Sequence, residues 1–341
     1  MADRKVLDVE QVAFSGHIVD DRSPEDFPLP ACMASLLTRL NGERRSRVIH
    51  AHGRDYTQRI DNYEILAATG MAYGLLWHAG YCLSCTDLTQ VNDHDDTIDR
   101  AFRWAGYEYE ILQRDEHDQR ELLDRVRRSI DAGAPVLAFG IFDAPECAIV
   151  AGYDGGSLIG WSPFQAFERC DTEENGMFRR ADWYEKLWKL VVPGRRVGRS
   201  LTDRDVLRRG LRILRQTQAE GYAAGRAAYD AWIATAEGLP GLSDEERGAR
   251  YRFHHQLVGT LAEARCWGAD FMDEHGAPDA ARHFKNIHDL CWKVWGAAGD
   301  DGARAARDPG VANAIAALLR EIRREDGLAE DALSRLVGED E

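Results

Sequence analysis

The stretch ECAIVAGYDGGSLIGW (146–161) decides the fold of the first half of this chain. A mostly apolar run at 146–153 is followed by Asp-Gly-Gly at 154–156, which is typical of a tight turn between strands. A second apolar run, 158–161, comes directly after it. The pattern predicts a β-hairpin with both strands rich in buried side chains.

The segments around this hairpin alternate between strand and helix patterns. Leu122, Leu123, Val126 and Ile130 recur at helical spacing and predict an amphipathic helix. Val12 and Phe14 alternate with small or polar neighbours and indicate an edge strand. Further strands are expected at 107–112, 135–139 and 189–192, and a further helix at 95–104. Together these elements predict an α+β domain over 1–195.

The second half, 196–341, changes character after Pro-Gly-Arg-Arg at 193–196. Thr202 is a good N-cap, and apolar residues then repeat at helical spacing. We expect helices at 203–214, 222–236, 243–272, 278–295 and 311–324, with no strand beyond Val192. Arg265 has no acid three or four residues away, so an ion-pair partner would come from another helix; the alternative is an exposed arginine. This half is predicted to be an all-α helical bundle.

Composition narrows the classes of function. The 341 residues carry a formal net charge of −15, which disfavours nucleic acids and anionic membrane surfaces as partners. The first residues lack the apolar segment of a signal peptide, and no apolar run is long enough to span a membrane. Seven irregularly spaced cysteines favour free thiols in a reducing compartment. We expect a cytoplasmic protein without a cofactor.

Cys32 is the most informative single residue. It follows Pro28 and Pro30 and begins an apolar segment that ends at Asn41-Gly42, which predicts a short helix at 31–40. Helix N-termini stabilise thiolates and supply N–H groups for an oxyanion hole, so Cys32 is a candidate nucleophile. The alternative is a small buried side chain, the usual state of a free cysteine.

The early cysteine, together with the later strand, Gly-Tyr-Asp turn and strand at 147–161, resembles the papain-like cysteine peptidase and transferase superfamily. More narrowly, the chain is similar to bacteriocin-processing-peptidase-like proteins and to the N-terminal family of the butirosin-biosynthesis acyltransferase. The stretches that carry the similarity are 76–78, 145–147, 152–154 and 159–161, within about 25–195. The resemblance implies a papain-like α+β domain with Cys32 as nucleophile.

The chain departs from that family at the catalytic base. Glu146 occupies the position of the family histidine, and Cys147 follows it. Ser162-Pro163 stands where the family has Asp-Pro. Three explanations stay open: Glu146 with a raised pKa is the base, His78 (or His17 or His94) supplies it, or the site is catalytically inactive. The family glutamine upstream of the nucleophile is not evident, and Asp26 or Glu25 lies nearest to its place. Substrate contacts are assigned to Cys147, Asp154, Trp161 and Ser162.

A metal site is the weaker interpretation of the remaining cysteines. His78, Cys82, Cys85 and His94 could together make four zinc ligands, but the cysteine pair lies among apolar residues where buried thiols are ordinary. We therefore expect no metal. Asp93 or Asp95 is more simply explained as the cap of the helix that follows.

The resemblance implies a cysteine-dependent acyl or aminoacyl transferase of secondary metabolism. Acyl transfer is favoured over peptide hydrolysis because a thioester needs less acid assistance than an amide. Alternatives are an inactive papain-like domain that binds a small molecule or peptide, and an amide hydrolase with a rearranged triad. An acyl carrier protein is a candidate donor, for which Arg44, Arg45 and Arg47 form a small basic cluster. A homo-oligomer formed through the helical half is a further expectation.

Overall fold

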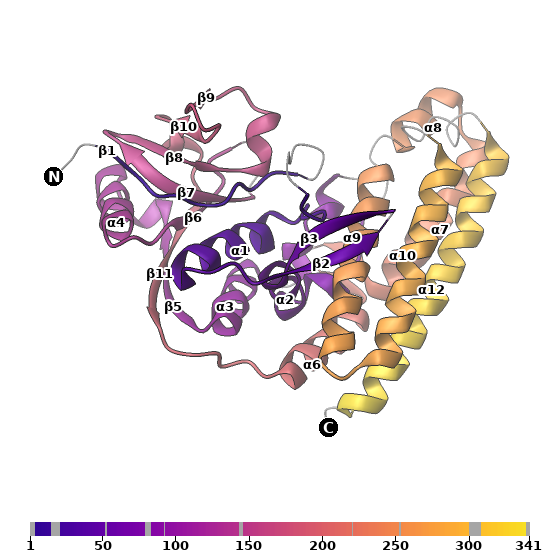
Figure 1. The fold of residues 1–341 in the computed structure, drawn as a ribbon. Helices are drawn as coiled ribbons and strands as arrows, with labels where there is room; N and C mark the ends of the chain where they lie inside the picture. Colours follow the sequence, from indigo (N-terminus) through magenta and orange to yellow (C-terminus); the bar gives the residue numbers. More distant parts are fainter. Residues whose placement is uncertain are drawn as a thin grey trace. The chain divides into compact units, whose positions relative to one another are not determined.

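A computed structural model describes residues 4–14, 21–51, 53–78, 83–91, 93–142, 146–219, 221–251, 254–299 and 308–338 (Figure 1). The chain is of mixed α+β type, with a helical C-terminal region. It divides into two compact units. The sheet unit comprises 1–65 and 101–200, and the helical unit comprises 66–100 and 201–341. The chain crosses between them within α2 (Ile60–Thr69), within α3 (His94–Ala105) and at Ser200.

The sheet unit is built on an eight-stranded sheet with the order β5-β11-β6-β7-β8-β10-β9, and β1 pairs with β7. Its strands are β1 (Arg4–Val6), β5 (Tyr107–Gln113), β6 (Val136–Phe139), β7 (Cys147–Asp154), β8 (Ser157–Trp161), β9 (Asp171–Thr172), β10 (Phe178–Arg180) and β11 (Lys189–Arg196). The predicted hairpin is β7 and β8, whose ladder runs antiparallel from Asp154–Ser157 to Ile149–Trp161. Helices α1 (Pro28–Asn41) and α4 (Gln119–Asp131) both pack on β7. A separate two-stranded hairpin, β2 (Ser46–Ala51) and β3 (Arg54–Arg59), and the one-turn helix α5 (Trp183–Lys186) complete the unit.

The N-terminal strand corrects the expected edge strand at Val12 and Phe14. The paired segment is β1, in which Val6 lies opposite Gly152. Residues 11–14 are irregular. A Cβ at Gly152 would come 2.5 Å from the Lys5 carbonyl oxygen, so β1 can approach β7 only because this residue is glycine. The glycine of the Gly-Tyr-Asp motif therefore has a packing reason within the sheet.

The helical unit consists of packed helices with a small three-stranded sheet. Its helices are α6 (Asp203–Leu214), α7 (Gly225–Gly238), α8 (Asp244–Tyr251), α9 (His254–Glu274), α10 (Pro278–Ala298) and α12 (Pro309–Val337). Helix α10 packs on both α9 and α12, and α12 also contacts α6 and α7. Strands β12 (Gln218–Ala219) and β13 (Tyr222–Ala224) pair with β4 (Leu76–Trp77), so the expectation of no strand beyond Val192 was wrong.

The units differ from the predicted domains 1–195 and 196–341 in residues 66–100, which group with the helical unit. Tyr73 in this segment packs against the Phe284 ring at 5.8 Å, and Trp77 stacks on Trp232 at 5.1 Å. Strand β4 also completes the small sheet. These contacts join positions more than 140 residues apart, and no local pattern in the sequence predicts them.

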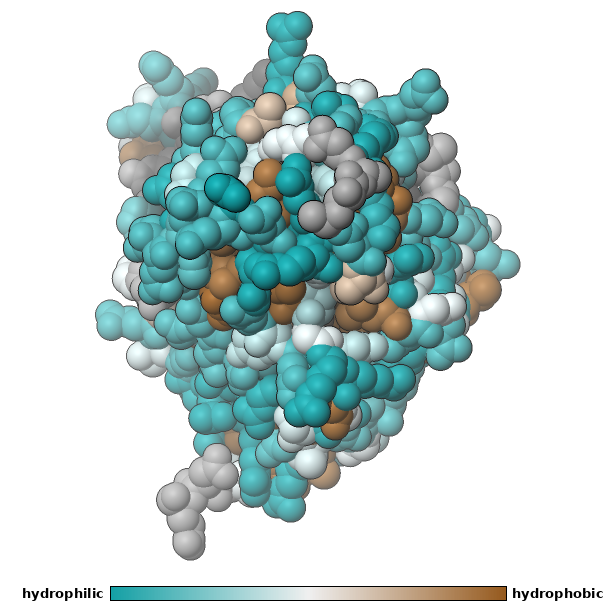
Figure 2. All heavy atoms as spheres, turned by 90° about the vertical axis from the view of Figure 1, so that its left-hand side faces the viewer, coloured by the Kyte–Doolittle hydropathy of each residue, from teal (hydrophilic) through white to brown (hydrophobic). Residues whose placement is uncertain are grey.

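Within the part of the chain that the structure describes, no helix combines the length and apolar character that a membrane-spanning segment requires. The face of the molecule drawn in Figure 2 is mostly hydrophilic, and its hydrophobic side chains form small, separate patches. Scattered apolar residues of this kind are ordinary on protein surfaces.

Candidate functional site

Cys32 is the fifth residue of α1, because the helix begins at Pro28 and not at Ala31. The Ala31 N–H already donates to the Phe27 carbonyl at 3.1 Å, so helical hydrogen bonding starts one residue before Cys32. Only the first four N–H groups of a helix lack an intrahelical partner, and two of these positions are prolines here. The backbone N–H of Cys32 therefore lies at a helix-interior position, which does not suit the predicted oxyanion hole.

The sulfur of Cys32 is completely buried and contacts the first residue of β7. Its Sγ donates to the Cys147 carbonyl oxygen at 3.6 Å, and both cysteines have 0% exposure. Neither a carboxylate nor an imidazole hydrogen-bonds to this sulfur within the described ranges. Cys32 thus contacts the strand where the resemblance expects the base, and the contact that the structure shows there is with a backbone carbonyl.

The sheet explains why the Cys147 carbonyl is available to a thiol. The Glu146 carbonyl accepts the Gly140 N–H at 3.3 Å on the β6 side, and carbonyls alternate along a strand, so that of Cys147 points away from β6. On that other side the β8 ladder ends at the Ile149–Trp161 pair, two residues short of Cys147. The thiol of Cys32 therefore supplies a donor that the sheet lacks.

Cys147 is a neutral thiol in this environment. Burial raises its pKa well above the ordinary value, and the hydrogen bond and charge of Cys32 and the charge of Glu146 raise it further. Its Sγ lies 3.8 Å from the Ala148 carbonyl oxygen. A thiolate at this position would be uncompensated, so Cys147 does not supply the base that the resemblance expects beside Cys32.

The acidic residues near Cys32 are part of the packing. Glu146 is half-buried beside Cys147, and residues 143–145 before it lie outside the described residues. Glu25 is buried and forms an ion pair with Arg59, whose Nε lies 2.8 Å from its Oε1. Arg59 also donates to the Ala31 carbonyl at 3.1 Å. Glu25 therefore holds the start of α1 through an arginine, and its carboxylate already has a strong partner.

Two of the candidate histidines belong to a different unit from Cys32, which lies in the sheet unit. His78 belongs to the helical unit, is exposed, and donates its backbone N–H to the Cys85 sulfur at 3.1 Å. His94 also lies in the helical unit, as the first residue of α3. The Asp93 carboxylate caps this helix by accepting the N–H of Asp95 at 2.8 Å, which confirms the capping prediction. His17 and Cys82 lie outside the described residues.

The residues assigned to substrate contacts are separated along the hairpin. Asp154 ends β7 at the opposite end from Cys147, and its pKa is lowered by hydrogen bonds from Arg179 and Arg4. Trp161 is buried and donates its Nε1–H to the Val9 carbonyl at 3.1 Å. Each is therefore explained by packing.

Ser162 is likewise explained by a structural contact. It lies one residue beyond the last pair of the β7–β8 ladder, at the same end of the sheet as Cys147. Its Oγ accepts the Phe164 N–H at 3.1 Å and caps a short 3-10 helix. This contact fits a capping residue and gives no sign of a role in orienting a base.

The basic cluster suggested for a carrier protein is internally paired. Arg44 bonds Glu10, Arg45 bonds both Asp61 and Glu64, and Arg47 bonds Gln58. Most of its charge is directed at the protein's own side chains, so a local basic patch is weak there. Among the described residues, no group of three or more metal-ligating side chains forms a metal site.

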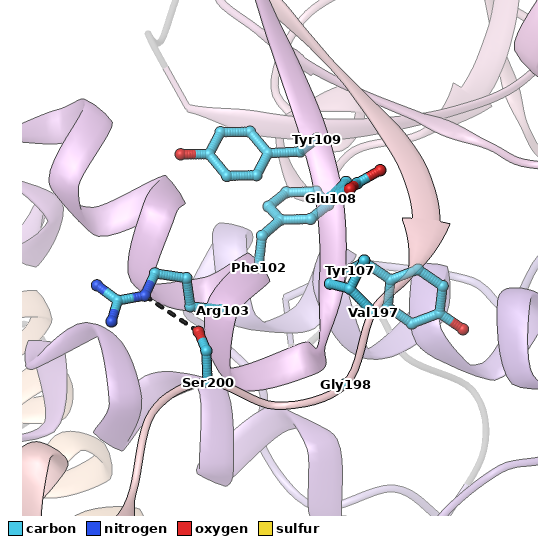
Figure 3. A pocket seen from close by; sticks show the side chains of 8 residues that line it. All are labelled: Phe102, Arg103, Tyr107, Glu108, Tyr109, Val197, Gly198 and Ser200. Carbon is cyan, nitrogen blue, oxygen red and sulfur yellow. Dashed lines mark hydrogen bonds between the residues drawn. The ribbon is translucent and has the colours of Figure 1, made fainter.

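A surface hollow of about 280 Å³ was not predicted from the sequence (Figure 3). It lies in the sheet unit between the end of α3, the start of β5 and the segment after β11. Its lining residues are Phe102, Arg103, Tyr107, Glu108, Tyr109, Val197, Gly198 and Ser200.

Two contacts organise the lining of this hollow. The Phe102 and Tyr109 rings lie one above the other with centroids 4.8 Å apart, and Arg103 Nε donates to Ser200 Oγ at 3.2 Å (Figure 3). A Cβ at Gly106 would come 2.7 Å from the Gly198 carbonyl carbon, so only glycine lets the returning segment close the hollow. The fold thus presents an aromatic pair beside an arginine and a hydroxyl group.

Comparison with known proteins leaves these sites unassigned, since no protein-family model matches the chain and no significant relative was found among curated proteins.

Proposed function

We propose that this protein is a non-catalytic binding protein built on a papain-like α+β unit, in which the former catalytic cysteine position is part of the core. The papain-like part of the proposal is supported by the order of elements. A cysteine on an early helix contacts the first residue of the strand that leads into Gly152-Tyr153-Asp154.

The burial of Cys32 carries the non-catalytic part of the proposal. A nucleophile needs solvent or substrate access and a base within about 2.6–3.2 Å. Cys32 has 0% exposure, and its sulfur donates to a backbone carbonyl. The thiol of Cys147, at the start of β7, is not a base at neutral pH, because burial raises its pKa and keeps it protonated. A protonated thiol cannot take a proton from Cys32.

The hollow at Phe102 and Tyr109 is the proposed ligand site. Segments 102–109 and 195–200 carry four arginines (Arg103, Arg195, Arg196 and Arg199) and one glutamate, although the whole chain is strongly acidic. Glu108 forms a two-point ion pair with Arg195, and the four arginines and one glutamate give these two segments a formal charge of +3 beside the aromatic pair. We assign this site to a small anion that carries a flat ring.

Alkylation of the folded protein tests the non-catalytic proposal. Each cysteine is mapped by mass spectrometry after timed iodoacetamide treatment between pH 6 and pH 9. We expect Cys32 to react more slowly than Cys170, which is partly exposed, at every pH. Fast and selective alkylation of Cys32 that persists below pH 7 would overturn the proposal and favour the cysteine-dependent acyltransferase or hydrolase.

Ligand binding tests the hollow with phenyl phosphate as the probe, measured by calorimetry. We expect Arg103→Ala to weaken binding by roughly tenfold or more, the usual effect of removing a charged hydrogen-bond donor. Arg54→Ala is the control, because Arg54 is an exposed arginine of the same unit that lies over an aromatic ring, at 4.3 Å from the Tyr56 centroid, and does not line the hollow. Equal affinity in both variants would exclude this hollow as the site.

A further inference from the structure

Strand β5 forms one end of the eight-stranded sheet of the sheet unit, and β9 forms the other. Strand β5 has 7 residues, whereas β9 has 2. Along its length β5 pairs with β11, and no other strand of the described residues pairs with it. An exposed edge strand is a template for a further strand, so β5 is the edge of this sheet that can take one.

The backbone groups of β5 alternate between its two sides. The Arg114 N–H donates to the Trp188 carbonyl at 3.0 Å, just before β11 begins. The Gly106 carbonyl likewise accepts an N–H from the segment that follows β11, so even-numbered residues face β11. The N–H and C=O groups of Ile111 and Gln113 therefore point away from β11, and no hydrogen bond within the described ranges uses them. This edge presents donors and acceptors for another strand.

Two glutamates of β5, Glu108 and Glu110, are ion-paired with arginines of the same unit. Arg195 Nε lies 2.8 Å from Glu108 Oε2, and Arg125 on α4 pairs with Glu110. Charged side chains on an edge strand normally discourage pairing with another chain. Since the arginines offset this negative charge, the glutamates influence the register of a partner strand more than they exclude the partner.

Like charges disfavour two of the registers in which β5 could pair with a second β5. In an antiparallel twofold pair, the outward-facing residues of the two strands lie opposite one another. With Tyr109 opposite Tyr109, Glu108 faces Glu110 of the other copy. With Glu110 opposite Glu110, two carboxylates meet on the axis. Like charges directly opposite one another destabilise a sheet, so neither register is favoured.

The register with Ile111 opposite Ile111 is self-complementary. It places Tyr109 opposite Gln113, both within β5, and Glu108 opposite Arg114, the residue just after the strand. Ile111 is half-buried, so pairing also covers apolar surface at the axis. One strand thus supplies opposite charges and an apolar contact for its own copy, which favours a second copy of this chain over a foreign peptide.

We propose that two copies of this chain pair antiparallel along β5, with Ile111 opposite Ile111, and form one continuous sheet across a twofold axis. The observation that carries the proposal is the long free edge, whose charges complement one another in this register. The surface lies in the sheet unit, whereas the sequence suggested the helical half for oligomerisation. The inference does not depend on ligand binding in the hollow.

Charge swapping at Ile111 tests both the surface and the register. Sedimentation velocity at about 100 μM chain should show the wild type as a dimer. Ile111→Lys and Ile111→Glu each place like charges on the axis, so each should weaken self-association by about tenfold or more. An equal mixture of the two variants should form dimers again, because an ammonium group then faces a carboxylate.

Val48→Lys is the matched control, since Val48 is 70% exposed on another edge strand of the same unit, β2. This variant should dimerise like the wild type. A wild type that has the mass of one chain at about 100 μM overturns the proposal. Dimers that both Ile111 variants retain use another surface and also overturn it. A mixture that stays dissociated, when each variant alone is dissociated, rules out this register and with it the proposal.

Hydrogen exchange of the wild type keeps the test valid if a variant does not fold. In the dimer the outward N–H groups of Ile111 and Gln113 are hydrogen-bonded to the second copy. Exchange of the peptide that contains them should therefore slow as the protein concentration rises from about 1 to about 100 μM. The peptide that contains β2 should exchange at a constant rate. Exchange at 107–113 that does not change with concentration contradicts the proposal.

Discussion

Among the residues that the structure describes, Arg59 of the sheet unit and Arg265 of the helical unit are the most deeply buried arginines, and they bind different kinds of partner. Arg59 in the sheet unit is 1% exposed and bonds Glu25, the Ser35 hydroxyl at 2.7 Å and the Ala31 carbonyl. Its partner Glu10 is partly exposed. All these partners lie within the first 59 residues. This arginine therefore organises the start of α1 among segments that are close in sequence.

Arg265 in the helical unit joins three distant segments. It is 0% exposed and pairs with Asp326 on α12, with Nε 3.1 Å from Oδ1. It also donates to the carbonyls of Ala72 at 2.8 Å and Gly74 at 3.1 Å. Because an unpaired buried carbonyl is costly, this arginine explains why residues 66–100 group with the helical unit. The expectation that its partner comes from another helix is confirmed.

The largest expected effect comes from Arg265→Ala. The change leaves the Asp326 carboxylate and two backbone carbonyls buried without their donor, so we expect a loss of about 3–5 kcal/mol in the free energy of unfolding. The measurement is urea denaturation combined with hydrogen exchange read by peptide. Exchange should increase in α9, in α12 and around Ala72. An equal increase in α1 would break the distinction between the two arginines.

Arg59→Ala should have the next largest effect, at the lower end of the same range, about 3 kcal/mol. The reason for the smaller value is that Glu10 can turn to water and keeps Arg44 as a partner. Exchange should increase in α1 and not in α12. The surface variant Arg54→Ala is the control for both arginines and should change stability by less than about 0.5 kcal/mol. A larger loss for Arg59→Ala than for Arg265→Ala contradicts this ranking.

His254 predicts a pH dependence that belongs to the helical unit. Burial, followed by the charge of His255, lowers its pKa to about 3, so the folded form stays neutral well below pH 6.5. Below pH 6.5 the unfolded chain binds a proton that the folded chain does not, and stability falls toward pH 3 by up to ~1.4 kcal/mol per pH unit.

The measurement for His254 is the urea midpoint between pH 4 and pH 7. We expect the free energy of unfolding of His254→Phe to depend less steeply on pH, by the amount that the uptake of about one proton on unfolding produces. His50→Ala, which changes an exposed histidine of the sheet unit, should leave the slope unchanged. If His254→Phe retains the wild-type slope, the pH dependence arises from other groups.

The smallest expected effects come from the helix N-caps, one of which is compared in each unit. Asp118 caps α4 in the sheet unit and Thr202 caps α6 in the helical unit, each through a reciprocal capping box. We expect Asp118→Ala and Thr202→Ala each to cost about 1 kcal/mol. Exchange should increase only in the first turns of the affected helix. A cap whose loss unfolds its whole unit would show that the unit is less stable than its packing indicates.

The features predicted correctly from the sequence are local ones. The hairpin of β7 and β8 was predicted because strand runs and a turn signal are adjacent, and the caps at Thr202 and Asp93 because their side chains bond N–H groups two or three residues away. The last helix shows the limit of such signals. Helix α12 continues past the predicted end at 324 to Val337, where Glu-Asp-Gly at 325–327 resembles a helix end. Asp326 stays helical while it pairs with Arg265 on another helix.

The candidate site shows the same division between local and distant information. That Cys32 lies on a helix after two prolines, and Cys147 at the start of a strand, follows from the sequence alone. Contacts between segments far apart in the chain decide that the Cys32 sulfur meets the Cys147 carbonyl and that Cys32 is sealed from solvent. They also decide that residues 66–100 join the helical unit. Local hydrogen bonding and hydrophobic periodicity determine the elements, whereas burial and the pairing of buried polar groups depend on which elements pack together. Only the tertiary structure decides that.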